Sequence, residues 1–185
     1  MQLENLVFVT SNLGKLREVE AVLEVDLEHR ALDVVEIQSL DLKEVVRHKA
    51  GVAQQRINRP VLVEDTSLEL AGMNGFPGPL VRWLLAAVGP EGICRLADAY
   101  GDRGATVRCL ACAADGHHEV FGLGVVEGTI AGRPKGRQGF GWDSVFLPAG
   151  GRGMTFAEMD SVEKNHISHR RMALEELKRA LRTGA

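Results

Sequence analysis

The sequence predicts an α/β fold with a mixed sheet, and three observations support this class. Short apolar runs typical of buried strands alternate with amphipathic helical stretches over the first half of the chain. Two longer apolar runs then flank Asp115-Gly116, a dipeptide typical of a hairpin turn. The length of 185 residues, of which 45% are hydrophobic and 25% charged, suits one domain over residues 1–185. Because strands that alternate with helices pair in parallel whereas a hairpin pairs antiparallel, the sheet is expected to be mixed.

The first half of the chain is predicted to alternate strands and helices. The predicted order is a strand at 6–9, a helix with Leu16, Val19 and Leu23 on one face, a weak strand at 31–37, a helix at about 41–57 and a strand at 61–63 that ends at Glu64.

The second half begins with a Gly- and Pro-rich loop and contains the hairpin. The predicted order is a loop at 72–79, helices at 80–88 and 91–100, strands at about 106–113 and 119–126, a Gly- and Arg-rich loop at 128–141, a strand at 145–147 and a helix at about 168–182.

The composition excludes several classes of protein. Lys and Arg total 22 against 25 Asp and Glu, and the net charge of −3 provides no general basic field for long nucleic acid. The longest apolar runs have six residues, far short of the ~18 that a membrane span needs. Three cysteines without framework spacing, and no basic-then-apolar leader, predict a cytoplasmic location. Cys109 and Cys112 lie three apart on a predicted strand and so point to opposite faces, which favours buried packing over a zinc or redox site.

The first candidate site is the loop Thr10-Ser11-Asn12-Leu13-Gly14-Lys15, which joins a predicted strand to a helix. Free backbone N–H groups and the helix dipole favour a phosphate at such a helix start. Lys15 falls in the first helical turn, where a cation is disfavoured unless an anion binds nearby. The segment lacks the P-loop pattern, and an ordinary polar helix cap is an equally good interpretation.

The second candidate combines the acidic pair Glu64-Asp65 with Lys49. The pair follows an apolar strand, and sites in open α/β sheets gather at the carboxyl ends of strands. A carboxylate there suits Mg²⁺ with phosphate oxygens completing the coordination, although a solvated turn is the other interpretation. Lys49 lies seven residues after Leu42 and four after Val45, on the apolar face of the predicted helix. Its side chain either runs along the surface to water or reaches into a cleft near Asp65.

The segment Gly139-Phe140-Gly141-Trp142-Asp143 is the third candidate. Two aromatic residues framed by glycines suit a flat ligand, because aromatic faces stack on nucleobases. Arg133, Lys135 and Arg137 precede the segment, and this basic triplet serves either phosphates or a solvated loop.

The start of the C-terminal helix is the fourth candidate. Ser168 is a natural N-cap, and His169, Arg170 and Arg171 follow it at the helix end where cations are unfavourable. Each such cation costs about 0.3–1 kcal/mol, and repeated violations of a local rule are expected at functional sites. The cluster predicts an anionic or acceptor-rich ligand, without which these cations are mildly destabilising.

Taken together, these segments resemble the inosine triphosphate pyrophosphatase family, which hydrolyses aberrant purine nucleoside triphosphates. The matching segments, in chain order, are 9–15, 36–38, 63–66, 75–79, 139–143, 155–159, 163–165 and 168–170. Ser11 and Ser144 depart from the pattern, since relatives usually have Gly and Pro there. The resemblance implies an elongated mixed sheet flanked by helices, with a ligand cleft between two lobes.

The resemblance also implies roles for individual residues. Glu36 and Asp65 would hold Mg²⁺, Asp65 would activate water, and Lys49 would be the second catalytic residue. The implied contacts to the nucleotide are Thr10, Ser11, Asn12, Leu13, Gly14 and Lys15 at the triphosphate, then Thr66, Arg82, Phe140, Gly141, Trp142, Asp143, Lys164, His169 and Arg170.

The implied reaction converts ITP, dITP or XTP to the monophosphate and pyrophosphate and so cleanses the nucleotide pool. Hydrogen-bond donors around position 6 of the purine would reject adenine, which has the reversed pattern there. A homodimer is implied, with the region 75–79 as one contributor to its interface, and neither a nucleic-acid nor a membrane partner is expected. Two alternatives remain open: a nucleotide-binding sensor of the same fold without hydrolysis, and a pyrophosphatase for pyrimidine or modified nucleotides.

Overall fold

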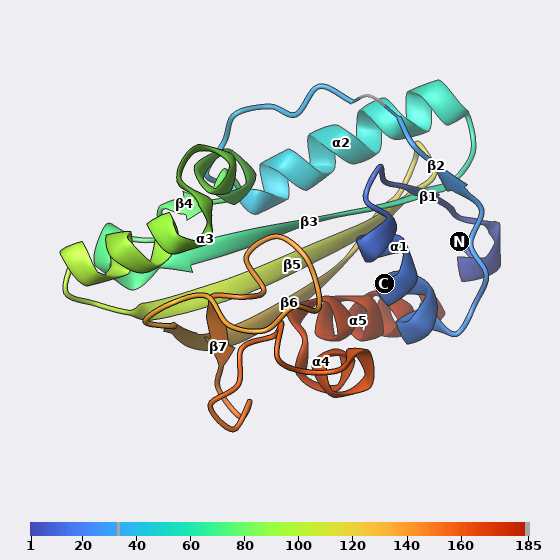
Figure 1. Cartoon of the computed structure of the whole chain (residues 1–185). Coiled ribbons are helices and arrows are strands. Elements are labelled where there is room, and N and C mark those ends of the chain that lie inside the picture. The colour runs from blue at the N-terminus through green and yellow to red at the C-terminus, as the bar shows by residue number, and fades with distance from the viewer. Residues whose placement is uncertain (33, 184–185) are drawn as a thin grey trace.

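A mixed sheet forms the centre of the molecule (Figure 1). The computed structural model describes residues 1–32 and 34–183, and within them seven strands pair in the order β2-β1-β3-β5-β6-β7, with β4 beside β3. β1 pairs in parallel with β2 and β3, and the other pairs are antiparallel, which confirms the mixed sheet. The strands are β1 (Val7–Val9), β2 (His29–Arg30), β3 (Val61–Leu70), β4 (Pro77–Gly78), β5 (Gly104–Ala114), β6 (Glu119–Ile130) and β7 (Phe146–Pro148).

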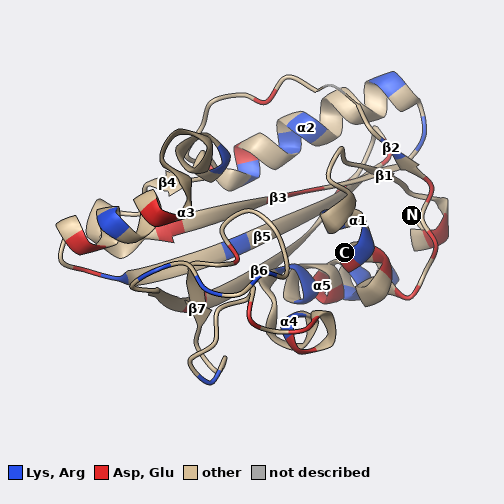
Figure 2. Cartoon of the chain, in the orientation of Figure 1, with Lys and Arg blue, Asp and Glu red and all other residues tan. Residues whose placement is uncertain are grey.

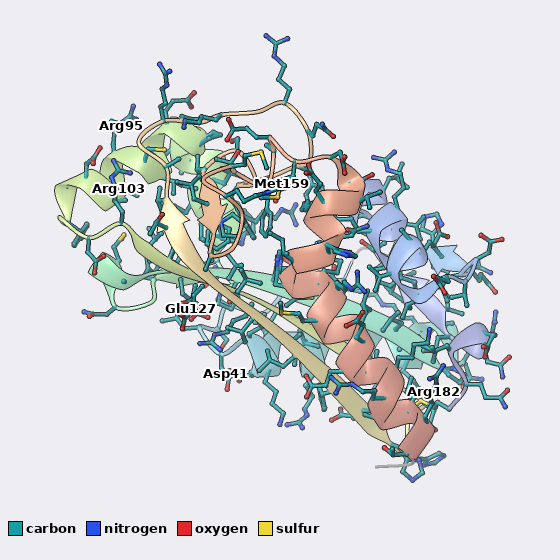
Figure 3. All side chains as sticks on the ribbon, turned by 90° about the horizontal axis from the view of Figure 1, so that it is seen from below. Asp41, Arg95, Arg103, Glu127, Met159 and Arg182 are labelled. Atoms are coloured by element: carbon teal, nitrogen blue, oxygen red, sulfur yellow. The ribbon has the colours of Figure 1, made fainter. Side chains whose placement is uncertain are left out.

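Helices cover both faces of this sheet. They are α1 (Leu13–Leu23), α2 (Leu42–Ile57), α3 (Val81–Ala99), α4 (Ser161–Ile167) and α5 (His169–Thr183), with single 3₁₀ turns at Leu3–Asn5 and Ala71–Met73. α2 lies on one face, and α1 and α5 lie on the other (Figure 1). The view from below shows α5 running along the sheet (Figure 3). α3 is kinked at Gly89, which has a φ of 68° and precedes Pro90, so that it corresponds to the two helices predicted there.

The alternation of side chains along β5 divides the core into two layers. Cys109, Ala111 and Ala113 pack with α1 and α5, whereas Leu110, Cys112 and Ala114 pack with α2. The two cysteines therefore point to opposite faces and are buried as free thiols, as predicted. Burial raises the pKa of Cys112 to about 12, and it raises the pKa of Cys109 as well.

A third apolar cluster lies at the far end of β3, β5 and β6, beneath α3. It includes Leu68, Val107 and Ile93 together with a group of aromatic rings, in which Phe146 packs edge-on to Trp142 at 5.8 Å. The three long strands connect this lobe to the lobe formed by the other two clusters. The elongated sheet and the two-lobed arrangement agree with the expected fold.

Four points of the predicted element order need correction: one strand, the ends of two others and one helix. The strand expected at 31–37 is absent from the described residues there, because the strand beside β1 is only His29–Arg30; residue 33 lies outside the described residues. β3 does not end at residue 63 but continues to Leu70, since it pairs with β5 along its whole length. β6 likewise extends to Ile130, into the predicted loop. The helix α4 was not predicted, although its N-cap Asp160 and Glu163 form a capping box, a signature visible in the sequence.

Candidate active site

A cleft of about 620 Å³ opens between the two lobes. Its walls are formed by the loop after β1, by α2 and β3, by the segment after β2, by α3 and by the segment 140–142. The lining residues are Val9, Thr10, Ser11, Asn12, Lys15, Ala31, Leu32, Val34, Glu36, Lys49, Asp65, Thr66, Pro79, Val81, Arg82, Leu85, Phe140, Gly141 and Trp142.

The start of α1 forms one wall of the cleft. The side chain of Asn12 caps the helix by accepting hydrogen bonds from the backbone N–H groups of Gly14 (2.8 Å) and Lys15 (3.2 Å), and Thr10 accepts from the N–H of Asn12. Since β1 is parallel to β3, with Phe8 opposite Leu62, this loop emerges at the level of the acidic pair in β3. The predicted helix cap is confirmed, and Thr10, Ser11, Asn12 and Lys15 of this segment line the cleft.

The acidic pair Glu64-Asp65 lies within β3 rather than at its end. Figure 2 shows acidic positions in red partway along this strand. Successive residues of a strand face opposite sides, and Glu64 accordingly points toward α1 and α5 while Asp65 faces the cleft and α2. Lys15 contacts both carboxylates, with its Nζ 2.9 Å from Glu64 Oε1 and 3.5 Å from Asp65 Oδ1. The expectation that the pair ends a strand was therefore wrong, but β1 ends beside it, and Asp65 is open to the cleft.

Lys49 reaches into the cleft. Its Nζ lies 3.7 Å from Glu36 Oε1 and 3.9 Å from Asp65 Oδ2, and it donates to the carbonyl oxygen of Glu64 at 3.4 Å. A snorkelling side chain would extend to water instead, so the geometry favours the second of the two interpretations. Arg82 is 76% exposed at the side chain and approaches Glu36 Oε2 at 3.8 Å from the opposite wall.

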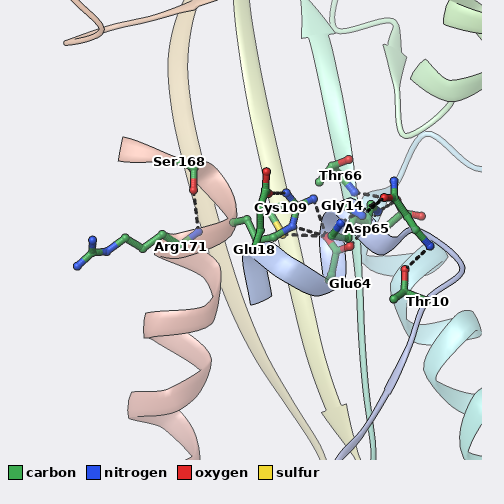
Figure 4. Close-up of polar contacts among 12 residues, drawn as sticks. Thr10, Gly14, Glu18, Glu64, Asp65, Thr66, Cys109, Ser168 and Arg171 are labelled. Carbon is green, nitrogen blue, oxygen red and sulfur yellow. Dashed lines mark hydrogen bonds and ion pairs between the residues drawn. The ribbon is translucent and has the colours of Figure 1, made fainter. Parts of the chain in front are cut away.

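A chain of buried ions continues behind the cleft. Lys15 pairs with Glu64, Glu64 with Arg170, Arg170 with Glu18, Glu18 with Lys164, and Lys164 with Asp143. Figure 4 shows the part of this network around Glu18, Glu64 and Asp65. The alternating charges connect Glu64, the neighbour of the cleft residue Asp65, to Asp143 of the aromatic segment.

The network holds Glu64, Lys15 and Arg170 in their charged forms, whereas burial outweighs Lys164 at Asp143 and raises the pKa of that carboxyl. Burial alone would raise the pKa of Glu64, but the Arg170 and Lys15 cations outweigh it and hold this pKa well below its usual range. Burial would likewise lower the pKa of Lys15, and the carboxylates of Glu64 and Asp65 raise it instead. The pKa of Arg170 is raised by Glu64 and Glu18 against the same effect of burial.

Four of the expected nucleotide-binding residues lie behind the cleft wall rather than in it. Asp143, Lys164, His169 and Arg170 are buried and do not line the cleft. The Phe140 ring, which does line it, lies 4.9 Å from the ammonium of Lys164 and 5.8 Å from the guanidinium of Arg170. These two cations are therefore one side chain removed from the open cleft.

His169 packs against two aromatic rings, which also contact each other. Its imidazole lies 5.4 Å from Trp142 and is stacked on Phe156 at 6.0 Å. Burial, with the Arg170 and Lys164 cations, lowers its pKa well below 6.5, and neither ring nitrogen has a hydrogen-bond partner among the described residues. The ring is thus neutral and retains an unused donor and acceptor.

Two further expected residues take no part in the cleft lining. Leu13 is exposed, and Gly14 lies beneath the ring of Phe140, where an added Cβ would stand 2.7 Å from the Phe140 Cδ1 atom. Gly14 therefore allows the aromatic segment to pack closely against the start of α1.

The start of α5 corrects one expectation from the sequence. Ser168 caps the helix by accepting from the N–H of Arg171 at 3.2 Å, as predicted. The sequence predicts that Arg170 is an unpaired cation in the absence of a ligand. In the folded chain, however, Glu18 and Glu64 neutralise it. The helix dipole acts only within α5, whereas the carboxylates that pair with Arg170 come from α1 and β3.

Two acidic residues of the network were not selected from the sequence. The sequence offers Glu64 only as the partner of Asp65 in an acidic pair, and Glu18 belongs to none of its candidate motifs. The spacing of Glu18 three residues after Lys15 places both on one side of a helix, which is the one local signal that points to Glu18. The alternation along an apolar strand extended past Val63 would have pointed to a buried Glu64.

Glu36 and Asp65 suit a hard divalent cation. Both are carboxylates on the cleft surface, and both lie within 4.0 Å of the same ammonium group. Mg²⁺ is commonly bound by one or two carboxylates, with substrate phosphates and water as further ligands. No group of three or more His, Cys, Asp and Glu residues surrounds a metal position within residues 1–32 and 34–183, which is consistent with a site completed by a phosphate ligand.

Comparison with known proteins agrees with this arrangement. Inosine triphosphate pyrophosphatase 2 of Trypanosoma cruzi is 45% identical over 176 residues, which cover 94% of this chain and 90% of that protein. The structure of a HAM1 protein from Coxiella burnetii is 30% identical and covers 97% of this chain and 100% of its own, with a TM-score of 0.77. The nucleoside-triphosphatase / dITP/XTP pyrophosphatase of Mycobacterium abscessus is 26% identical, covers 96% and 97% and has a TM-score of 0.69. Since the profile of the Ham1 family also matches residues 6–180, almost the whole length over which these elements form, the chain belongs to the Ham1 family.

Proposed function

We propose that the protein is a Mg²⁺-dependent nucleoside triphosphate pyrophosphatase that converts ITP, dITP and XTP to the monophosphate and pyrophosphate. The observation that carries this proposal is the convergence of Glu36, Asp65, Lys49 and Lys15 at one end of a cleft that begins at a helix N-terminus. Carboxylates that can hold a cation, together with ammonium groups at the positive end of a helix dipole, suit a metal-bound triphosphate. Its relatives named inosine triphosphate and dITP/XTP pyrophosphatase support the choice of substrate.

The chain's own residues would act on the triphosphate as follows. Thr10, Ser11 and Asn12, at the start of α1, hold phosphate oxygens, and Lys15 and Lys49 offset the negative charge that moves toward the leaving pyrophosphate. The Asp65 carboxylate accepts a proton from the water that attacks the α-phosphorus, while the bond from that phosphorus to the bridging oxygen breaks. Oδ1 of Asp65 accepts from the backbone N–H of Thr66 at 2.8 Å, which fixes the orientation of this carboxylate. The monophosphate and pyrophosphate are then the products.

Glu36 and Asp65 would hold the Mg²⁺ ion. When bound, the ion supplies charge neutralisation and orientation of the phosphate oxygens. Lys49, which contacts both carboxylates, keeps them in place and balances their charge.

The base would lie against Phe140, Gly141 and Trp142, which line the cleft. The rings there offer flat surfaces for a purine, and the neutral His169 and the cations Lys164 and Arg170 lie directly behind them. Donors behind these rings would match the O6 acceptor of a 6-oxo purine and leave adenine mismatched. A movement of the Phe140 side chain would bring these donors into reach.

The proposal extends to the organisation of the protein. The whole chain, residues 1–185, acts as one nucleotide pyrophosphatase domain. Free cysteines that are buried suit the reducing cytoplasm. Phe76 and Trp83, which are large apolar side chains exposed in and after the region 75–79, support a homodimer formed through that region. No helix within the described residues is long and apolar enough to cross a membrane.

Release of pyrophosphate across a panel of nucleotides tests the proposal. ITP, XTP and dITP are expected to be cleaved in the presence of Mg²⁺, and ATP, GTP and the pyrimidine triphosphates far more slowly. Asp65→Asn keeps the size of the side chain and should abolish turnover while circular dichroism shows an intact fold. Binding of ITP without release would instead identify a sensor, and a preference for pyrimidine or modified triphosphates would replace the substrate class.

A further inference from the structure

Glu64 has a carboxylate whose two oxygens face different cations. Oε1 lies 2.9 Å from Lys15 Nζ, and Oε2 lies 3.2 Å from Arg170 Nη2 and 3.4 Å from Arg170 Nε. The thiol of Cys109 also approaches Oε2, at 3.4 Å. The side chain is 1% exposed and does not line the cleft, so Glu64 has no direct access to a ligand there.

The two cations occupy different places relative to the cleft. Lys15 comes from the first turn of α1 and lines the cleft, whereas Arg170 comes from the first turn of α5 and is buried behind it. Arg170 has a second carboxylate partner in Glu18, which alone would neutralise it. Lys15 has only the more distant Asp65 at 3.5 Å besides Glu64 among the described residues, and Asp65 faces the metal and water side of the cleft.

We propose that Glu64 is a positioning residue of the cleavage reaction, which fixes the ammonium of Lys15 in the phosphate end of the cleft by joining it to the buried Arg170. This inference rests on the proposed function, because it assigns Lys15 to the triphosphate. Arg170 is the anchor, since it is 2% exposed and paired on both sides. Glu64 transmits that fixed position to a lysine whose long side chain would otherwise sample many rotamers.

The geometry explains why the position of Lys15 matters. A cation in the first turn of a helix is disfavoured by the helix dipole, so Lys15 needs a nearby anion in the free protein. Glu64 supplies that anion from below the cleft and leaves the cleft surface to the phosphates. A charge that is already in place stabilises the transition state without reorganisation, which is the condition for a large contribution to catalysis.

This role predicts opposite changes in rate and in binding. Glu64→Gln removes the ionic hold on Lys15, so kcat should fall by about tenfold or more. The same substitution removes a negative charge close to the phosphate site, so inorganic pyrophosphate should bind about twofold or more tightly. Simple loss of folded protein would lower the apparent kcat but would not tighten binding.

A double-mutant cycle tests whether Glu64 acts through Lys15. The variants are Lys15→Ala, Glu64→Gln and the double variant, with kcat measured on ITP and the dissociation constant of pyrophosphate measured by calorimetry. Cys109→Ala is the matched control, because this thiol touches the same carboxylate oxygen, carries no charge and lies outside the cleft. In the Lys15→Ala background, Glu64→Gln is expected to change kcat by less than about twofold.

Each outcome decides the proposal. A loss of kcat from Glu64→Gln that is as large without Lys15 as with it would overturn the positioning role, and so would weaker binding of pyrophosphate to Glu64→Gln. If Glu64→Gln does not fold, Glu64→Asp keeps the charge on a side chain one methylene shorter and should lower kcat without tightening pyrophosphate binding; a wild-type kcat in that variant would refute the idea. If the wild-type protein binds pyrophosphate but cleaves no triphosphate, the proposed function fails, while the effect of Glu64→Gln on pyrophosphate binding still tests the contact with Lys15.

Discussion

Lys49 lies on the apolar face of its helix but forms ionic contacts. It lies on the buried side of α2, yet its ammonium meets two carboxylates and a carbonyl oxygen at the cleft. The methylene groups of such a lysine can lie along the apolar face of a helix while the ammonium group extends beyond that face, here to the cleft. The residue therefore serves the site more than the core.

Lys49→Ala should lower kcat/KM for ITP by about a hundredfold, since it removes a charge aimed at the phosphates. The free energy of unfolding should change by less than about 1 kcal/mol, because partly exposed ion pairs contribute little to stability. Steady-state kinetics and urea denaturation measure the two quantities. Lys43→Ala on the same helix, where the lysine lies over the Phe121 ring outside the cleft, is the control and should leave kcat/KM unchanged. A destabilised Lys49→Ala protein with normal kcat/KM would mean that the lysine is structural.

Arg170 is the buried counterpart of this lysine. Arg170→Gln leaves Glu18 and Glu64 without the cation they share, and uncompensated buried charge is costly. The expected loss in the free energy of unfolding is about 3–5 kcal/mol. Its neighbour Arg171 pairs with Glu175 on the surface, so Arg171→Gln should cost less than about 1 kcal/mol. Urea denaturation of the two variants compares these values, and equal stabilities would show that Arg170 is not held by the network.

Among single residues, the sequence predicted those members of the site whose position depends only on the local helix or strand pattern. Asn12 as a cap, Asp65 as an open carboxylate and Lys49 near it all follow from residue type and helical or strand position. Glu18 and Glu64 did not follow, because their roles depend on α1, β3 and α5 meeting at one point. Pairing between buried ions far apart in the chain leaves no periodic signal in the sequence.

Among the elements, α5 lies unusually close to β6. A Cβ added at Gly124 would overlap the carbonyl oxygen of His169, and one at Gly122 would overlap that of Ala173. The two glycines of β6 thus form a flat surface on which the backbone of α5 rests. This close approach is what brings His169 and Arg170 down to the level of Glu64.

Gly124→Ala should therefore push the start of α5 away from the sheet. We expect a loss of about 2–3 kcal/mol in the free energy of unfolding, as for overpacked cores. Gly51→Ala is the matched control, because Gly51 is an exposed position of α2 with no atom within 4 Å of an added Cβ. The control should be stabilised by about 0.5–1 kcal/mol, the usual helix preference for alanine. Thermal melts distinguish them, and similar melting temperatures would refute the close packing of α5.

Element by element, the prediction succeeded where periodicity and turn signals agreed. The hairpin of β5 and β6 was recognised from alternation and from Asp115-Gly116, and Gly116 indeed has a φ of 92°. The segment at 31–37 was misread as a strand because its apolar residues Leu32 and Val34 line the cleft instead of a sheet. Apolar residues at a ligand site imitate a weak strand.

For the whole molecule, the apolar core and the proposed active site draw on different residues. The three apolar clusters form without Glu36, Asp65 or Lys49, and these site residues neutralise one another in the folded chain. The mixed sheet was predictable from the order of elements. Its elongation and the cleft between lobes came only from the family resemblance, since the sequence pattern does not say that three strands serve both lobes.

Removal of divalent metal should separate activity from folding. With EDTA, ITP turnover is expected to be lost, whereas the melting temperature should shift by less than about 2 °C, which for a chain of this size is below ~1 kcal/mol. Mg²⁺ and pyrophosphate together should raise the melting temperature, because a ligand bound only to the folded state stabilises it. Scanning calorimetry with and without EDTA provides the comparison. A large drop in EDTA would mean that metal is part of the fold.

All three thiols are buried, so the rate at which each one reacts reports how often the structure around it opens. Cys94 lies in the cluster beneath α3, and Cys109 and Cys112 lie in the two layers of the other lobe. A thiol-specific reagent can modify each cysteine only while the surrounding cluster is locally unfolded. The labelling rates therefore measure the frequency of local unfolding in each lobe. Mass spectrometry after timed exposure would resolve the three rates, and a nucleotide held between the lobes should slow Cys94 together with the other two. Fast labelling of the resting protein would show that one of these clusters is not closed.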